Sequence, residues 1–145
     1  MDNKYKLIRP EDVFVSIFDR EATEEEMWMG LPRHFEGNRP TGNNFMDLFA
    51  RLVRQYQCRD IVFYAELMGI PDQFFGKAIR AMSGMSAVAW RDRYTILSAC
   101  ELLAKSDDSI TDIAKRLGFS TASSFCHYFL KHSKSTPREW RRRHQ

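Results

Sequence analysis

The sequence of 145 residues contains few residues that cross-link or interrupt a chain: three cysteines, seven glycines and five prolines. The cysteines, at positions 58, 100 and 126, show neither CxxC nor Cys/His ligand spacing, which argues against a disulfide framework or a zinc site. The low glycine and proline content excludes collagen-like and low-complexity chains. No apolar run approaches the ~18 residues that a membrane-spanning helix requires, so we expect no membrane contact.

Motifs of common enzyme classes are also missing from the sequence. It has no G-x-S-x-G, no phosphate-binding loop and no H-E-x-x-H, and its four histidines suggest no zinc site. We therefore expect a protein that is not an enzyme and needs neither a metal nor a cofactor. The start, Met1 to Lys4, lacks the form of a signal peptide, which favours a soluble protein of the cytoplasm.

Charge is present but unevenly distributed. The net charge is +3, yet residues 1–47 carry 6 Lys/Arg against 10 Asp/Glu, whereas residues 48–145 carry 16 against 9. Residues 109–145 alone carry 8 basic and 2 acidic side chains. A basic region that follows an acidic one indicates a polyanionic partner, without saying which.

Two copies of a unit of about 50 residues follow one another in the chain. Residues 83–93 align with residues 133–143 at an offset of 50, so that Trp90 matches Trp140 and Arg91 matches Arg141. Upstream the offset becomes 49, which places Gly69 over Gly118. Each copy must therefore form one supersecondary motif.

Each copy predicts two short helices separated by a glycine turn. In the second copy, Ser109 caps a helix with apolar positions at i, i+3, i+4 and i+7, and Gly118 ends it. In the helix that follows, Phe125 and Phe129 face inward. The first copy has the same pattern around Gly69. The buried side of its second helix is predicted to consist of Phe74, Phe75, Ala78, Ile79 and Met82. This is the arrangement of a helix-turn-helix motif.

A longer helix, predicted over residues 87–104, joins the two motifs and would be about 27 Å long. A helix capped by Asn44 precedes the first motif, and a short helix that opens at Thr136-Pro137 follows the second. We therefore predict an all-α, seven-helix domain over residues 44–145, preceded by an acidic extension and linker, residues 1–43, of uncertain structure.

The two helix-turn-helix units joined by one long helix resemble the DNA-binding domain of AraC-type bacterial transcription regulators, most strongly in the second copy. The resemblance lies in Ile-x-x-Ile-Ala-x-x-Leu-Gly-Phe-Ser at 110–120 and Thr-Pro-x-x-Trp-Arg at 136–141, and it covers about 100 residues from Phe45 onward. It implies a monomer that inserts one recognition helix from each motif into successive major grooves of duplex DNA. The sequence departs from the family at Lys134, where glycine is usual, and at Ala87, which replaces a common proline. Residues 1–43 are too few for the effector-sensing domain that many members carry, so we expect none in that segment.

The resemblance places the recognition helices at about 72–82 and 121–131. The predicted DNA-contacting residues are Gln73, Lys77, Arg80, Thr121, Ser123, Ser124, His127 and Lys131, with Arg91 and Arg138 as weaker contacts to the DNA backbone. The amide of Gln73 can pair with adenine, whereas lysine and arginine need only charge and reach to contact phosphates. His127 stands where the family often has arginine, so we expect weaker discrimination for guanine there.

Two further readings of the sequence stay open. The same helices could form a protein-interaction module, with RNA polymerase as its partner and weak or no DNA binding. The acidic extension could fold onto the basic domain, mimic DNA to inhibit it, or offer a surface to another protein. The favoured function is sequence-specific regulation of transcription through double-stranded DNA.

Overall fold

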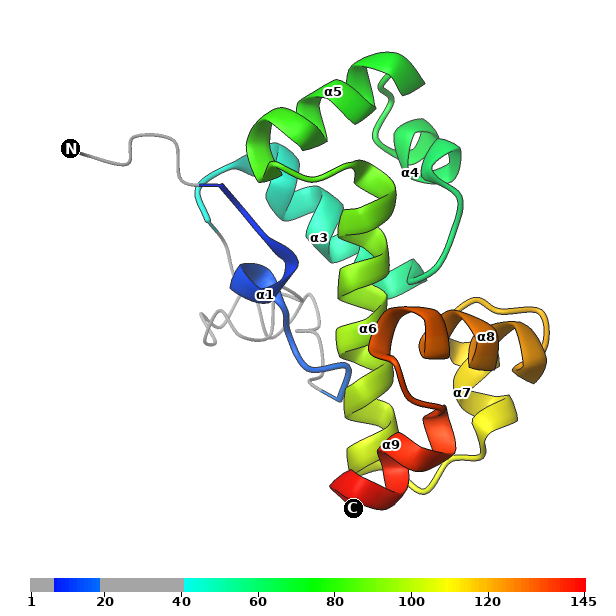
Figure 1. Ribbon diagram of the computed structural model, residues 1–145. Coiled ribbons are helices and arrows are strands. Elements are labelled where there is room, and N and C mark those ends of the chain that lie inside the picture. Colours follow the sequence, from blue (N-terminus) through cyan, green and yellow to red (C-terminus); the bar gives the residue numbers. More distant parts are fainter. Residues whose placement is uncertain (1–6, 19–40) are drawn as a thin grey trace, which may run out of the picture.

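The computed structural model describes residues 7–18 and 41–145, and these two ranges contain helices and loops but no strand (Figure 1). The helices are α1 (Pro10–Val13), α3 (Asn44–Tyr56), α4 (Ile61–Leu67), α5 (Asp72–Ser83), α6 (Ala87–Lys105), α7 (Ile110–Arg116), α8 (Ala122–Ser133) and α9 (Pro137–His144). The all-α prediction and its seven helices after residue 43 are confirmed. Most of the predicted extension, residues 1–6 and 19–40, lies outside the described ranges. No helix in the described ranges is long and apolar enough to cross a membrane.

Five of the described helices, α3, α6, α7, α8 and α9, begin at side chains that accept hydrogen bonds from free backbone N–H groups. Ser109 accepts from the backbone N–H of Asp112 at 3.0 Å, as predicted. At α9, Thr136 and Glu139 form a reciprocal capping box around Pro137. The cap of α3 is Asn43 rather than the predicted Asn44, because the Asn43 side chain accepts from Met46 N–H.

The internal repeat is present in the backbone geometry. Gly69 and Gly118 both have positive φ, at 69° and 89°. Both turns are closed by equivalent hydrogen bonds, from Ile70 N–H to the Ala65 carbonyl at 3.0 Å and from Phe119 N–H to the Ala114 carbonyl at 2.9 Å. The two motifs therefore share one type of turn between their helices.

The α5 and α8 helices also end alike. Gly84 follows α5 with φ 73°, and Lys134 follows α8 with φ 66°, both in the left-handed conformation. Ser83 Oγ donates to the Ile79 carbonyl at 2.6 Å, and Ser133 Oγ donates to the Phe129 carbonyl at 2.7 Å. The departure from glycine at residue 134 therefore leaves the geometry of the helix end unchanged.

The two motifs lie along different halves of the long helix α6 (Figure 1). Each half of α6 carries a separate hydrophobic core. With its N-terminal half, α1, α3, α4 and α5 form a core of Val13, Met46, Phe49, Ala50, Val53, Tyr64, Ala65, Phe75, Ile79, Ala87, Trp90 and Tyr94. With its C-terminal half, α7 and α8 form a core of Ala99, Leu102, Leu103, Ile113, Ala114, Leu117, Phe125 and Phe129. Each motif thus packs as a separate unit against one half of α6, which is about 28 Å long at 1.5 Å per residue.

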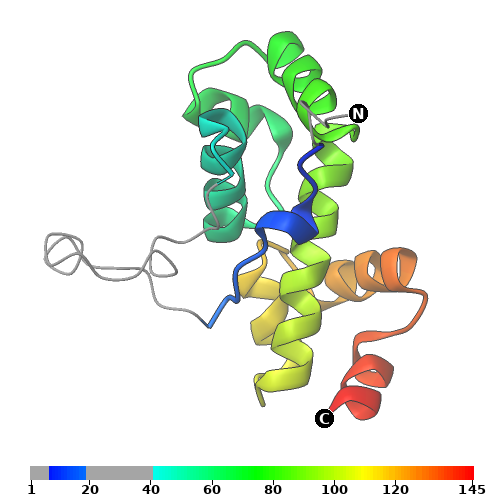
Figure 2. The ribbon, with the colours of Figure 1, turned by 90° about the vertical axis from the view of Figure 1, so that its left-hand side faces the viewer.

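Residues 7–18 lie along α6 and take part in both halves (Figure 2). Val13 is fully buried in the first core, and Ile17 packs against the second. Trp90 Nε1–H donates to the Ile8 carbonyl at 3.1 Å, and the backbone N–H of Ile17 donates to Glu101 Oε1 at 2.9 Å. Of the readings left open for the acidic extension, these twelve residues fold onto the helical domain.

Candidate nucleic-acid interface

The second helix of each motif is anchored through two aromatic or aliphatic side chains. Phe75 and Ile79 of α5 are fully buried, as are Phe125 and Phe129 of α8. In both helices the pair is separated by four residues and therefore lies on one face. Because that face is fixed in a core, the opposite face of each helix has a defined direction toward solvent.

The outward faces carry every contact residue predicted on these two helices. Those residues, Gln73, Lys77, Arg80, Thr121, Ser123, Ser124, His127 and Lys131, are all exposed. On α5 the spacing i, i+4 and i+7 places Gln73, Lys77 and Arg80 on one stripe. The structure thus presents an amide and two cations from α5, and small hydroxyls, an imidazole and a cation from α8.

Two of these residues also serve the fold. Thr121 is the N-cap of α8, where its Oγ1 accepts from Ser124 N–H at 3.0 Å. Ser124 Oγ donates in turn to the Thr121 carbonyl at 2.9 Å. Thr121 Oγ1 also donates to Ser124 Oγ at 3.1 Å, so these bonds hold the two exposed side chains close to the helix.

The prediction that Phe74 is buried is wrong. Phe74 is 56% exposed, whereas its neighbour Phe75 is fully buried. Successive residues on a helix point about 100° apart, so two adjacent large side chains do not both face the centre of one core. The exposed ring lies beside Gln73, at the repeat position that Ser124 occupies in α8.

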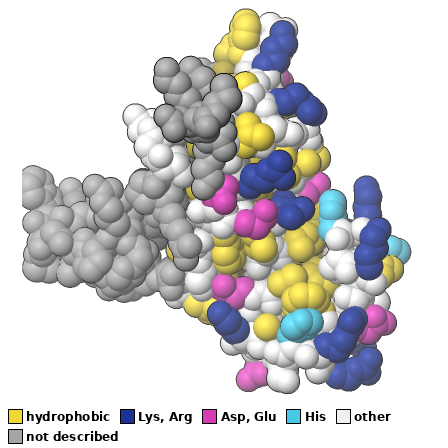
Figure 3. Space-filling view, turned by 60° about the vertical axis from the view of Figure 1, so that its left-hand side comes forward, with side chains coloured by type: hydrophobic (Ala, Val, Ile, Leu, Met, Phe, Trp, Pro, Cys, Tyr) yellow, Lys and Arg dark blue, Asp and Glu magenta, His cyan; other side chains and the backbone are white. Residues whose placement is uncertain are grey.

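Basic side chains extend over much of the molecule. In Figure 3, Lys and Arg side chains follow the face from its top, near α5, to the lower right, and Asp and Glu side chains lie between them. Some of the charges form exposed pairs, including Arg93 with Glu11 at 2.8 Å and Arg143 with Glu139 at 3.8 Å. Exposed pairs of this kind contribute little to stability, so the excess positive charge is available to a polyanion.

The two arginines predicted to contact the DNA backbone have different surroundings. Arg138 is exposed at the start of α9. The Arg91 side chain is only 13% exposed, and its guanidinium donates to Asp92 Oδ1 through Nη2 at 2.6 Å and Nε at 3.1 Å. Arg91 Nη1 donates to the Arg59 carbonyl at 2.9 Å. Its donors are used inside the protein, which gives Arg91 a structural role.

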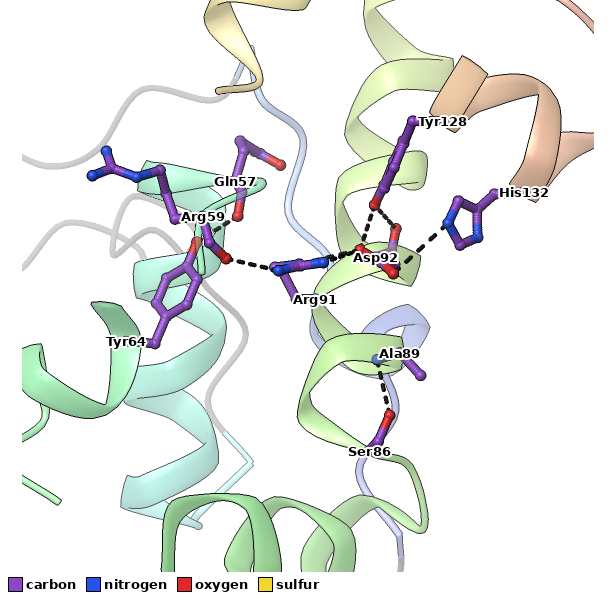
Figure 4. A network of polar contacts seen from close by, with 9 residues as sticks. All are labelled: Gln57, Arg59, Tyr64, Ser86, Ala89, Arg91, Asp92, Tyr128 and His132. Atoms are coloured by element: carbon purple, nitrogen blue, oxygen red, sulfur yellow. Dashed lines mark hydrogen bonds and ion pairs between the residues drawn. The ribbon is translucent and has the colours of Figure 1, made fainter. Parts of the chain in front are cut away.

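Asp92 also contacts α8 (Figure 4). Tyr128 Oη donates to Asp92 Oδ1 at 2.7 Å, and His132 Nε2 lies 3.7 Å from Asp92 Oδ2. Burial, with the nearby Asp92 carboxylate, raises the pKa of the Tyr128 hydroxyl well above its ordinary value, so this group remains a donor. We call Arg59, Arg91, Asp92, Tyr128 and His132 the Asp92 network.

Comparisons with known proteins agree with this geometry. A family model described as a helix-turn-helix domain matches residues 64–143. The regulatory protein PocR of Salmonella typhimurium is 41% identical over 68 residues, which cover 47% of this chain and 22% of PocR.

Solved structures show the same fold. A transcriptional regulator from Chromobacterium violaceum, described as containing an AraC-type DNA-binding domain, matches with a TM-score of 0.60 at 19% identity, over 71% of this chain and 94% of its own. The DNA-binding domain of AdpA, solved with a target DNA, matches with a TM-score of 0.60 at 23% identity, over 68% of this chain and 90% of its own.

The chain belongs to the AraC-type helix-turn-helix family. The family model covers both motifs almost completely, from Tyr64 in α4 to Arg143 in α9. Because the chain spans only about a fifth of the length of PocR, the match concerns this region of the relative.

Sequence reasoning about this AraC-type domain did not identify the Asp92 network. One signal was available, since Asp92 lies three residues before buried Thr95 and seven before buried Ala99 on α6. A carboxylate on a face that is otherwise buried needs partners. Its main partner, Tyr128, is 36 residues away, and only the folded chain brings the two together.

Proposed function

We propose that this AraC-type chain is a sequence-specific transcription regulator that inserts α5 and α8 into successive major grooves of duplex DNA. The observation that carries the proposal is the pair of equivalent helices, each buried on one face and exposing its predicted contact residues on the other. The AdpA domain, solved with DNA, shares this fold and supports the assignment.

In the proposed complex, the cations and the polar side chains have separate roles. Lys77, Arg80 and Lys131, with Arg138, contact phosphates, where charge and reach are sufficient. Gln73 reads adenine through its amide, and His127 reads a base edge less strictly than an arginine would. Thr121, Ser123 and Ser124 make short contacts to bases or phosphates. The proposal includes binding as a monomer in the bacterial cytoplasm and a role in recognition rather than catalysis.

A second candidate is a protein-interaction module with RNA polymerase as its partner. It is favoured by three large hydrophobic side chains that the first motif exposes by about half, Val62 and Leu67 on α4 and Phe74 on α5. Exposed apolar side chains are common one at a time, so this observation weighs less than the paired recognition helices.

A fluorescence-anisotropy titration with random duplex DNA at several salt concentrations tests the proposal on the full chain. If about five phosphates are neutralised, log K falls against log salt with a slope near −4.5. The double substitution Lys77→Ala and Lys131→Ala is expected to make the slope shallower by about 2, because two counterion-releasing contacts are lost. Lys105→Ala is the matched control, since Lys105 is an exposed lysine at the C-terminal end of α6.

Salt-insensitive or absent binding would contradict the DNA proposal. An equal loss in the Lys105→Ala control would show that general charge, rather than the recognition helices, provides the affinity. Weak DNA binding whose affinity is the same in the wild type and in the Lys77→Ala and Lys131→Ala double variant would favour the protein-interaction module.

A further inference from the structure

We infer that Asp92 and Tyr128 fix the orientation of α8 relative to the first motif, and so determine the spacing of the two DNA half-sites that the protein accepts. The inference rests on the proposed function, since it concerns how α5 and α8 act together on one duplex. Both residues are positioning residues, because they act through the helices that contact DNA.

The contact of Asp92 with α8 is specific and largely shielded from water. The Asp92 side chain is 12% exposed and accepts from Tyr128 Oη at 2.7 Å. His132, one turn after Tyr128, packs against its ring at a tilt of 54° with centroids 4.6 Å apart, and its Nε2 lies 3.7 Å from Asp92 Oδ2. A carboxylate on α6 thereby holds two side chains on the same side of α8 (Figure 4).

The same carboxylate is linked to the first motif through Arg91. Arg91 donates to Asp92 Oδ1 with two nitrogens and to the Arg59 carbonyl with a third. Arg59 directly precedes Asp60, the N-cap of α4. The segment before α4 is held further by Tyr64 Oη, which donates to the Gln57 carbonyl. The Asp92 side chain therefore connects the start of the first motif with the recognition helix of the second.

On α6 itself, the hydrophobic side chains divide between the two cores and do not bridge them. On α6, the first core includes Tyr94 and the second begins at Ala99. Between them the buried side chains are the polar Thr95 and Ser98, and Ser98 Oγ accepts from Gln57 Nε2 at 3.1 Å. Hydrophobic burial has no preferred direction, whereas charge-assisted hydrogen bonds require defined distances and angles. The polar contacts of the Asp92 network therefore act beside the bond from Cys58 N–H to the Leu117 carbonyl, and beside the packing of residues 7–18, in fixing the relative orientation of the motifs.

The spacing of half-sites is a sensitive measure of that orientation. One additional base pair between half-sites moves the second by about 3.4 Å and rotates it by about 35° around the helix axis. Two recognition helices in a fixed relative orientation bind poorly to half-sites displaced in this way, whereas helices whose relative orientation can vary still bind them.

The test is selection of bound duplexes from a random library by the full chain, followed by sequencing and titration of the selected sites. The wild type is expected to select two half-sites at one spacing and to lose about tenfold in affinity when one base pair is inserted. Tyr128→Phe, which removes one hydroxyl, and Asp92→Asn, which keeps an acceptor, are expected to select the same half-sites at two or more spacings. Insertion of one base pair is expected to lower the DNA affinity of these two variants by about threefold or less.

His127→Ala is the matched control on the same helix, because it alters an outward residue outside the Asp92 network. It is expected to change base preference and to keep the wild-type spacing. Thermal unfolding followed by circular dichroism shows that each variant is folded, and Tyr128→Phe decides the outcome alone if Asp92→Asn does not fold.

Folded variants with the spacing discrimination of the wild type would overturn the inference and leave the proposed function intact. If the wild type enriches no sequence at all, the proposed function fails, and the inference fails with it. If it enriches single half-sites only, DNA binding stands and the inference is overturned.

Discussion

Lys134 holds a backbone conformation that disfavours its own side chain. Its φ is 66°, in the left-handed region that glycine adopts without steric cost, and the equivalent residue after α5 is Gly84. For residues with a Cβ this conformation costs about 1 kcal/mol. The Leu130 carbonyl nevertheless accepts from Lys134 N–H at 2.9 Å, so the helix end is complete despite this cost.

Lys134→Gly is therefore expected to raise the free energy of unfolding by about 0.5–1 kcal/mol, since it removes the steric cost but increases the freedom of the unfolded chain. Urea denaturation of the full chain measures the change. Lys134→Ala is the control, because it removes the same charge but retains a Cβ. An equal gain in both variants would attribute the effect to charge and contradict the conformational argument.

At the scale of elements, the two glycine turns share a conformation but not their surroundings. A Cβ on Gly118 would lie 3.1 Å from the Cys58 carbonyl oxygen, whereas a Cβ on Gly69 would have no heavy atom within 4 Å. Cys58 N–H also donates to the Leu117 carbonyl at 3.1 Å. The turn of the second motif thus packs directly against the segment that leads into the first.

Gly118→Ala is expected to lower the free energy of unfolding by about 2 kcal/mol, because it adds a backbone contact to the strain of a positive φ. Gly69→Ala adds only the strain of the positive φ and is expected to lower the free energy of unfolding by about 1 kcal/mol. The difference between the two variants in chemical denaturation measures the contact between the turns. Equal losses would show that Cys58 moves away without cost.

The helices were predictable from sequence because their signals are local. The cap at Ser109, the turn at Gly118 and the inward pair Phe125 and Phe129 each depend on neighbours within one helical turn or two. The Asp92–Tyr128 contact depends on side chains 36 residues apart, which periodicity does not detect. The contact residues on α5 and α8 could be placed on an exposed face, but their partners on DNA remain predictions.

At the scale of the whole molecule, residues 7–18 are part of the domain that the sequence indicated only from residue 44. Val13 is fully buried, and the segment also supplies the acceptor for Trp90 and donors to Glu101. A fragment that starts at residue 44 would therefore expose part of the first core and leave the Trp90 indole N–H without this partner. For this reason, DNA binding is to be measured with the full chain and not with a fragment that starts at residue 44.

Val13→Ala is expected to lower the free energy of unfolding by about 2 kcal/mol, because two methyl groups leave a filled core. Val62→Ala is the matched control, since it is the same substitution at a side chain that is 47% exposed. Its effect is expected to stay within about 0.5 kcal/mol. A stability loss no larger at Val13 than at Val62 would mean that the segment detaches from the domain in solution.

The position of this segment has a consequence for the synthesis of the protein. Ile8 bonds to Trp90, and Ile17 bonds to Glu101, across 82 and 84 residues of sequence. Contacts of such long range form late and slow the folding of small domains. On the ribosome, the first hydrophobic core is therefore expected to stay open until Tyr94, near the middle of α6, has left the exit tunnel, and the bond between Ile17 and Glu101 forms later still.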